Sequence, residues 1–326
     1  MYSDLPLWAS IGFVLAGLVL LAWSSDRFVA GAAALARNLG VSPFIVGMVV
    51  VGFGTSAPEL LVSMFSGLSG YTNLSLGNAY GSCVFNIAAI LGVAALVRPL
   101  VVKRQVVLAA LPILSLITII SWVLLRDATL SRVNALILLA LFFVVMPLYC
   151  KFDKAPPQDD TGDVPDMSTT LAVVWSVVGL GVMVTASHML VWGAVDIARA
   201  LKVSELLIGL TIVAIGTSIP ELASAIAASR RNESELVLGN IVGSNIFNML
   251  AVVGIAGVIS PSDGFSKYIL SRDLPALFLV TLLIGAFGFN FKKPREKGVI
   301  NRFEGAIWVL MFCVYMALTL YQETCN

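Results

Sequence analysis

The stretch GTSAPEL at residues 54–60 returns almost unchanged as GTSIPEL at residues 216–222. A second stretch, LGNAYGSCVFN at residues 76–86, returns as LGNIVGSNIFN at residues 238–248. Both pairs are separated by the same 162 positions, and this spacing holds without a gap for residues 25–99 of the first copy. Agreement of this length does not arise by chance, so the chain consists of two copies of one structural unit.

The composition places both copies in a membrane. Hydrophobic residues make up 59% of the 326 residues, charged residues make up 12%, and the mean hydropathy is +0.95. Soluble domains carry about a quarter charged residues, so lipid must cover the surplus apolar surface. Each apolar segment is near or above the roughly 20 residues that a spanning helix needs. The sequence therefore predicts an all-α polytopic membrane protein with ten transmembrane helices, centred in residues 7–24, 43–66, 74–97, 105–125, 130–150, 171–192, 204–229, 235–259, 274–290 and 303–321.

The number of spans per copy predicts that the two copies are inverted. Because five is odd, the second copy must enter the membrane from the opposite face, which makes the halves inverted five-helix repeats. We expect the first repeat at residues 1–150 and the second at residues 171–326. The polar tract 151–170 between them is predicted to be a cytoplasmic linker. It lacks the ligand spacing of an EF-hand loop, although a calcium-sensing role stays open.

The distribution of basic residues predicts the orientation. Of the 20 Lys and Arg residues, 14 fall on the side of the odd-numbered loops. The positive-inside rule puts those loops in the cytoplasm and both termini outside, as expected for a multi-pass protein of the cell (inner) membrane. The net charge of +1 says nothing about nucleic acid, so no nucleic-acid partner is predicted; membrane lipid is expected to surround the chain, and no obligate protein partner is evident. The four cysteines have no paired spacing that would indicate disulfides or a zinc site.

Glu59 and Glu221 are the decisive residues, because each lies inside a strongly apolar segment. An ionised carboxylate at that depth costs at least about 2.5–3.5 kcal/mol. No Lys or Arg lies within the segments that form the repeat cores, so the missing countercharge is most simply a bound cation. An alternative is helix capping, since Ser56 and Ser218 precede the two acids at capping-box spacing. The two interpretations are compatible.

Neighbouring residues could supply further oxygen ligands. Gly54 with Pro58, and Gly216 with Pro220, should interrupt the helices and free backbone carbonyls. Carboxylates, hydroxyls and such carbonyls would provide the roughly six to eight oxygens that calcium prefers, and nearby neutral oxygens could hold sodium. No Cys or His belongs to the set, which argues against zinc, copper or nickel. The candidate side chains besides the two acids are Thr55, Thr217, Ser82, Ser244, Asn86 and Asn248.

The paired motifs resemble the two alpha-repeats of the cation/calcium exchanger superfamily, particularly those of prokaryotic sodium/calcium exchangers. The resemblance covers nearly the whole chain. It implies a secondary active antiporter, not an enzyme, that exchanges sodium for calcium by alternating access at a mid-membrane site and needs no cofactor. It further implies that spans one and six slide as a gating segment. The ligand positions that it implies are Glu59, Glu221, Thr55, Thr217, Ser56, Ser218, Ser82, Ser244 and the carbonyls of Gly52 and Ala214.

Two positions depart from that pattern, and other functions stay open. Several relatives, including potassium-dependent ones, carry Asp where this chain has Asn248, so potassium co-transport is not expected. Gly52 stands where Ala is more usual. A calcium/proton antiporter of the same fold remains an alternative, and a passive cation channel is less favoured because inverted repeats suit a carrier. His188, the only histidine, is expected to be a polar group near a helix end, with a transport role left open.

Overall fold

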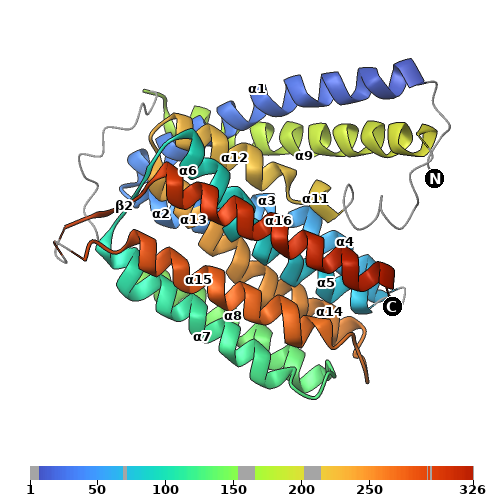
Figure 1. Cartoon of the computed structure of the whole chain (residues 1–326). Coiled ribbons are helices and arrows are strands. Elements are labelled where there is room, and N and C mark those ends of the chain that lie inside the picture. Colours follow the sequence, from blue (N-terminus) through green and yellow to red (C-terminus); the bar gives the residue numbers. More distant parts are fainter. Residues whose placement is uncertain are drawn as a thin grey trace.

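The computed structural model describes residues 7–68, 72–152, 166–201, 214–291, 293 and 296–325. Within these ranges the protein is helical apart from a short two-stranded sheet. Figure 1 shows two long helices, α1 (Leu7–Leu39) and α9 (Thr169–Ala200), side by side along one side of a bundle formed by the other helices. Of the predicted linker 151–170, residues 153–165 lie outside the described residues.

The described helices of the two halves follow in corresponding order, but the short strand precedes the fourth span in the first half and follows the corresponding span in the second. In the first half they are α2 (Pro43–Val46), the π-helical segment η1 (Gly47–Val51), α3 (Gly52–Thr55), α4 (Ala57–Leu68), α5 (Thr72–Val84), η2 (Phe85–Leu91), α6 (Gly92–Val97), β1 (Leu100–Val102), η3 (Val106–Ala110), α7 (Leu111–Leu124) and α8 (Arg132–Phe152). In the second half they are α11 (Ala214–Gly216), α12 (Ile219–Arg230), α13 (Ser234–Ile246), η5 (Phe247–Val252), α14 (Val253–Ile259), η6 (Ile269–Asp273), α15 (Leu274–Gly288), β2 (Gly298–Ile300) and α16 (Arg302–Cys325).

Eight helices in the described ranges are long and apolar enough to cross a membrane, and a ninth span is gained if the bent pair Pro43–Thr55 and Ala57–Met64 counts as one. The predicted seventh span, residues 204–229, is described only from residue 214 onward. The first and sixth spans are longer than predicted, with 33 and 32 residues in helix. At about 1.5 Å per residue, α1 is roughly 50 Å long, which exceeds the roughly 30 Å hydrocarbon layer.

Glycines let α1 and α9 approach closely. Gly17 and Gly31 of α1 are the repeat equivalents of Gly179 and Gly193 of α9, and each faces the opposite helix. A Cβ added to Gly31 would lie 2.8 Å from the carbonyl oxygen of Ala172, closer than real side chains come. Small residues at such positions let backbones pack directly on each other in a membrane. The two long helices therefore form a pair built around equivalent glycines.

The centre of the bundle consists of the helices that carry the second repeated stretch. In the apolar window of the span Ser234–Ile259, 89% of the residues are buried, and in that of Ser75–Val97, 78% are, against 11% for Arg302–Gln322. All residues of α13 are buried. The broken helix of the first half crosses α13 at backbone distance, because a Cβ on Gly47 would lie 2.7 Å from the Leu236 carbonyl oxygen. The repeat cores are thus packed against each other.

Both predicted helix interruptions are present. The chain bends by 41° between α3 and α4, where Ser56 has φ −81° and ψ 4°. Ser218 lies between α11 and α12 with nearly the same angles, φ −96° and ψ 12°. Pro58 and Pro220 follow these serines and have no N–H to donate to the preceding turn. Each half therefore has a broken helix that restarts just before its glutamate.

Candidate cation site

Glu59 and Glu221 occupy the first turns of the restarted helices α4 and α12. Their exposed fractions are 0% and 1%. The carboxylates lie near each other, because each is hydrogen-bonded to the serine at the helix break of the opposite half. Neither forms an ion pair with a cationic side chain in the described part of the chain. The structure thus brings the two acids together from opposite halves, within one buried region.

Each acid is held by a serine of the other half. Ser218 donates a hydrogen bond to Oε1 of Glu59 at 2.7 Å, and Ser56 donates to Oε1 of Glu221 at 3.1 Å. Ser218 makes no capping hydrogen bond to its own helix, so the capping-box interpretation is wrong for this serine. Its hydroxyl instead donates a hydrogen bond to the carboxylate of Glu59, in the opposite repeat. The crossed pairs place the four side chains around one point between the halves.

Several buried polar atoms of the two acids and of the two predicted amide ligands have no hydrogen-bond partner among the described residues. They are the second carboxylate oxygens of Glu59 and Glu221, the side-chain oxygen of Asn86, and both polar atoms of Asn248. Leaving a buried polar group unpaired costs about 1–3 kcal/mol, and more for a charged group. A cation coordinated by the oxygens would remove this cost. The donor set, carboxylates and neutral oxygens, is the one that hard cations prefer.

The predicted hydroxyl ligands lie around the acids. Thr55 is fully buried, and its Oγ1 lies 2.9 Å from the Val51 carbonyl oxygen, to which it donates. Ser82 lies within reach of the Ser218 hydroxyl, with 3.2 Å between the two oxygens. Thr217 is half-buried in the turn between α11 and α12. These positions agree with a shared site between the repeats.

Two predicted carbonyl ligands stand at the ends of the broken helices. The carbonyl oxygen of Gly52, at the start of α3, accepts a hydrogen bond from Ser244 of α13 at 3.3 Å. A Cβ on Gly52 would lie 2.9 Å from the Ser244 nitrogen, so the small residue allows this close approach. Ala214 is the first residue of α11, and nothing is described of its side chain.

Asn86 and Asn248 lie in the first turns of the π-helical segments η2 and η5. Asn86 donates to the side-chain oxygen of Asn245 at 3.2 Å, and Asn245 in turn donates to the Cys83 carbonyl at 3.3 Å. Cys83 and Asn245 are equivalent positions of the two repeats. The amides of the first and second halves therefore have different surroundings. π-Helical turns are frequent at functional sites because they change which residues face inward.

Two residues of the region were missed by the sequence prediction. Asn78 of α5 and Asn240 of α13 are equivalent asparagines in the second repeated stretch. Thr217 donates to Asn78 Oδ1 at 3.5 Å, and Thr55 lies 3.3 Å from Asn240 Oδ1. Both copies carry asparagine at this position, and this repetition was the sequence signal that could have identified the two residues. His188, by contrast, is an exposed residue within α9 rather than near its end, because that helix continues to Ala200.

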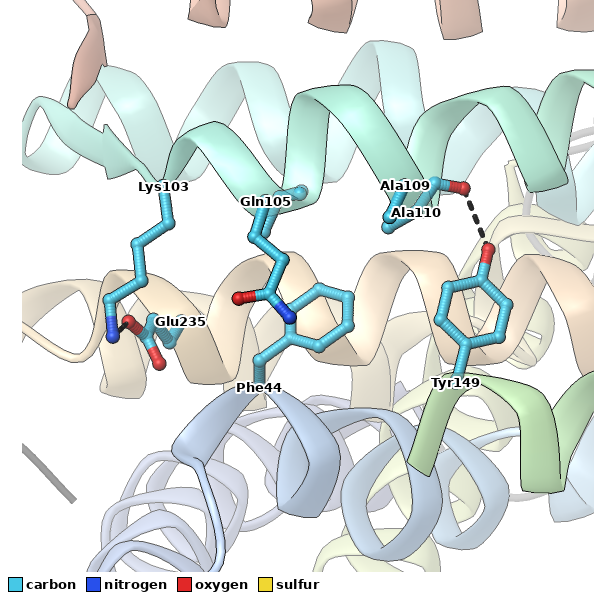
Figure 2. Close-up of a pocket in the computed structure, with 8 residues that line it drawn as sticks. Phe44, Lys103, Gln105, Ala109, Ala110, Tyr149 and Glu235 are labelled. Carbon is cyan, nitrogen blue, oxygen red and sulfur yellow. Dashed lines mark hydrogen bonds and ion pairs between the residues drawn. The ribbon is translucent and has the colours of Figure 1, made fainter. Parts of the chain in front are cut away.

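A small pocket elsewhere in the bundle has charged residues but a different character (Figure 2). In the wall of this pocket, Lys103 forms an ion pair with Glu235, which lies at the start of α13, so the two charges compensate each other. Further along, Tyr149 donates a hydrogen bond to the Ala110 carbonyl at 2.7 Å. The pocket thus offers no uncompensated negative charge. In the described ranges, no group of three or more His, Cys, Asp and Glu side chains is arranged so that it could hold a metal ion.

Comparison with known proteins identifies the fold. The chain is similar to the solved sodium-calcium exchanger NCX_Mj, soaked with sodium and strontium, with a TM-score of 0.83 and 30% identity over 96% of this chain and 99% of that one. The inner membrane protein YrbG of Escherichia coli is 35% identical, covering 95% of this chain and 98% of its own length. A protein of Alkalimonas amylolytica named "Putative antiporter CaxA" is 40% identical, over 94% and 97%.

A family model described as sodium/calcium exchanger protein matches residues 9–149 and 171–321. The structural match confirms the predicted fold of ten transmembrane helices in two inverted repeats, and with it a multi-pass integral membrane protein. The protein is a transporter and not an enzyme, as predicted. The chain belongs to the sodium/calcium exchanger protein family.

Proposed function

We propose that the protein exchanges sodium for calcium across the cell (inner) membrane, at one site between Glu59 and Glu221. The observation that carries the proposal is the pair of buried carboxylates, each with one oxygen held by a serine of the opposite repeat and the other without a described partner. Two like charges in a low-dielectric interior repel each other strongly unless a cation lies between them. A divalent cation compensates both charges at once.

The ligand set that we propose combines these acids with neutral oxygens from both halves. Calcium takes roughly six to eight oxygen ligands in flexible geometry, which two carboxylates alone do not supply. Smaller groups of the same oxygens suit sodium ions, so the two substrates would compete for the acids. The further ligands are Thr55, Thr217, Ser56, Ser218, Ser82, Ser244, Asn86, Asn248 and the carbonyls of Gly52 and Ala214.

The neutral side chain of Asn248 supports sodium rather than potassium as the coupling ion. This amide is fully buried, and neither of its polar atoms has a partner among the described residues. A carboxylate at this position would add a third negative charge to the site. Without it, the site carries only the charge that one calcium ion or two sodium ions compensate.

Alternating access follows from the cost of moving an empty site. Two uncompensated carboxylates resist passage through the apolar barrier, whereas a loaded site does not. We propose that α1 and α9 slide together along the bundle, since they pack as a pair through equivalent glycines. Ser187 of α9 donates to the Gly216 carbonyl at 3.0 Å, at the break before α12. This contact links the moving helices to the site.

The orientation that we propose places the odd-numbered loops and the linker 151–170 in the cytoplasm, with both termini outside. The excess of Lys and Arg in those loops supports it. The printed name of the Escherichia coli relative, an inner membrane protein, supports the same membrane. The repeats would then extend over residues 1–150 and 171–326.

Calcium uptake into proteoliposomes tests the proposal, with sodium, potassium and proton gradients imposed separately. We expect uptake with an outward sodium gradient only, and none in Glu59→Gln or Glu221→Gln. Glu296→Gln is the matched control, because this exposed carboxylate pairs with Lys293 far from the bundle centre. Uptake by either glutamine variant at the wild-type rate would exclude a shared site. Uptake driven by a pH gradient alone would replace sodium by protons as the coupling ion.

A further inference from the structure

Asn78 and Asn240 form a pair of equivalent contacts that the ligand set does not include. Asn240 is 2% exposed and Asn78 is half-buried. Each offers its side-chain oxygen to a threonine of the opposite repeat: Asn240 Oδ1 lies 3.3 Å from Thr55 Oγ1, and Asn78 Oδ1 lies 3.5 Å from Thr217 Oγ1. Equivalent contacts in both inverted halves indicate a common role in the site.

The neighbouring serines decide how the amide of Asn240 is turned. Ser224 donates its only hydroxyl hydrogen to the Glu221 carbonyl at 2.9 Å. Its oxygen can therefore only accept from Asn240, whose Nδ2 lies 3.1 Å away. This assigns Nδ2 to the serine side and Oδ1 to the side of Thr55. A flipped amide would place the acceptor Oδ1 against the Ser224 oxygen, whose only hydrogen already points to the Glu221 carbonyl.

The same logic fixes Asn78. Ser63 donates its hydroxyl hydrogen to the Ser75 carbonyl at 3.2 Å, so its oxygen accepts from Asn78 Nδ2 at 3.1 Å. Asn78 Nδ2 also donates to the Glu59 carbonyl at 3.2 Å. Its Oδ1 must then face Thr217, and it can only accept. In both halves a serine thus turns an amide oxygen toward a threonine hydroxyl.

We infer that Asn78 and Asn240 are positioning residues that accept the hydroxyl hydrogens of Thr217 and Thr55 when a cation is bound. A threonine hydroxyl has one hydrogen and two lone pairs. If the hydrogen pointed at the cation or at a carboxylate that binds it, the oxygen could not act as a ligand. Asn78 Oδ1 gives the hydrogen of Thr217 such an acceptor. Asn240 Oδ1, at 3.3 Å, shares the hydrogen of Thr55 with the Val51 carbonyl, which lies 2.9 Å from the hydroxyl oxygen. In both cases the lone pairs of the threonine can face the ion. Because each asparagine comes from the opposite repeat, ligand geometry depends on the packing of both halves.

This inference rests on the proposed function, because it concerns the same cation site. Equilibrium binding of radiolabelled calcium to the purified full-length protein tests it through double-mutant cycles. We expect Asn240→Ala to weaken calcium binding about three- to tenfold, the range that losing one hydrogen bond gives. In the Thr55→Val background the same substitution should have little further effect, since the hydroxyl that it orients is gone.

The inverted repeats supply a matched control. Asn240→Ala combined with Thr217→Val joins two residues that the contacts do not connect, so these effects should be additive. Asn78→Ala should show the reverse pattern, coupled to Thr217→Val and additive with Thr55→Val. If the deeply buried Asn240→Ala variant does not fold, this second cycle still tests the inference.

The outcomes separate the two ideas. Calcium binding by the wild type with additive effects in the Thr55 and Asn240 cycle would overturn the positioning role and leave the cation site intact. Equal coupling in contacting and non-contacting pairs would also overturn it, because general loosening of the site would explain the losses. Absence of calcium binding by the wild type would instead refute the proposed function itself.

Discussion

Replacing Gly243 by alanine tests whether the packing of α13 on the first repeat sets the geometry of the cation site. A Cβ at this position would lie 2.7 Å from Met48 Cα, and the carbonyl oxygen of Met48 is also in its way. Ordinary contacts begin at 3.4 Å, so the two backbones would have to separate by about 0.7 Å along this line. Both obstructing atoms belong to the backbone, so no rotamer change can relieve the contact.

The displacement has an expected effect on stability and on the site. Overpacking of a buried position typically costs about 1–3 kcal/mol, partly offset by the better helix propensity of alanine. The hydrogen bond from Ser244 to the Gly52 carbonyl is already 3.3 Å long. A further separation of about 0.7 Å would break it. We therefore expect a lower unfolding temperature, by a few degrees, together with weaker calcium binding.

Thermal unfolding in detergent, followed by tryptophan fluorescence, measures the first effect, and equilibrium calcium binding measures the second. Gly181→Ala is the control, because Gly181 is exposed on α9 and an added Cβ there would meet no described atom within 4 Å. It should unfold and bind as the wild type does. If Gly243→Ala kept both the wild-type unfolding temperature and calcium affinity, the close backbone contact would not constrain the site.

Three further changes address single contacts. Asn248→Asp adds a third carboxylate to the site and should change the cation dependence of calcium uptake; an unchanged profile would show that position 248 is not a ligand. Arg231→Gln removes a bidentate ion pair, with two oxygens at 2.8 Å, that ties Asp26 of α1 to the end of α12. Because Asp26 is half-exposed, the change should shift the balance of open states by at most about fivefold, measured by cysteine labelling from each side. Tyr149→Phe loses the bond to Ala110 and should lower stability by about 1 kcal/mol while leaving calcium affinity unchanged, as unfolding and binding assays would show.

The architecture could be predicted from the sequence because it depends on local apolar segments and on the number of spans in each repeat. Span positions follow from apolar segments, and inversion follows from an odd number of spans per repeat. The ends of α1 were not predictable in this way, since Asp26 and Arg27 interrupt the apolar segment. In the fold, Asp26 pairs with Arg231, and the Arg27 guanidinium lies 5.4 Å from the ring of Trp175. Tertiary partners that compensate charge allow the helix to continue.

Within the site, the acids were predictable and their hydrogen-bond partners were not. Burying an ionised glutamate in an apolar segment costs free energy, so its repetition at an equivalent position indicates a functional site. The spacing of Ser218 and Glu221 instead suggested a local cap, whereas the Ser218 hydroxyl binds Glu59. Asn78 and Asn240 were not predicted for the same reason. Their partners belong to the other repeat, and contacts across an inverted interface leave no trace in local spacing.

The serine contacts of the two acids follow the pseudo-symmetry of the repeats more closely than the surrounding helices do. The crossed bonds between the serines and the acids occur in both halves. Ser187 binds the carbonyl of Gly216 at 3.0 Å, whereas its equivalent, Ser25, turns back to the Ala22 carbonyl at 3.1 Å. In the exchange cycle that we propose, the two halves would exchange conformations as access alternates, and we expect this difference to reverse.

One contact cannot exchange in this way, because the sequence provides it only once. The residues equivalent to Asp26 and Arg231 are His188 and Ser69, which cannot form a carboxylate–guanidinium pair. When the halves exchange roles, this ion pair therefore has no counterpart in the opposite state. In the exchange cycle that we propose, the crossed serine–carboxylate bonds would be present in both open states, whereas the ion pair would stabilise only one of them. We therefore expect cation selectivity and the preference for one open state to depend on separate residues of the same fold.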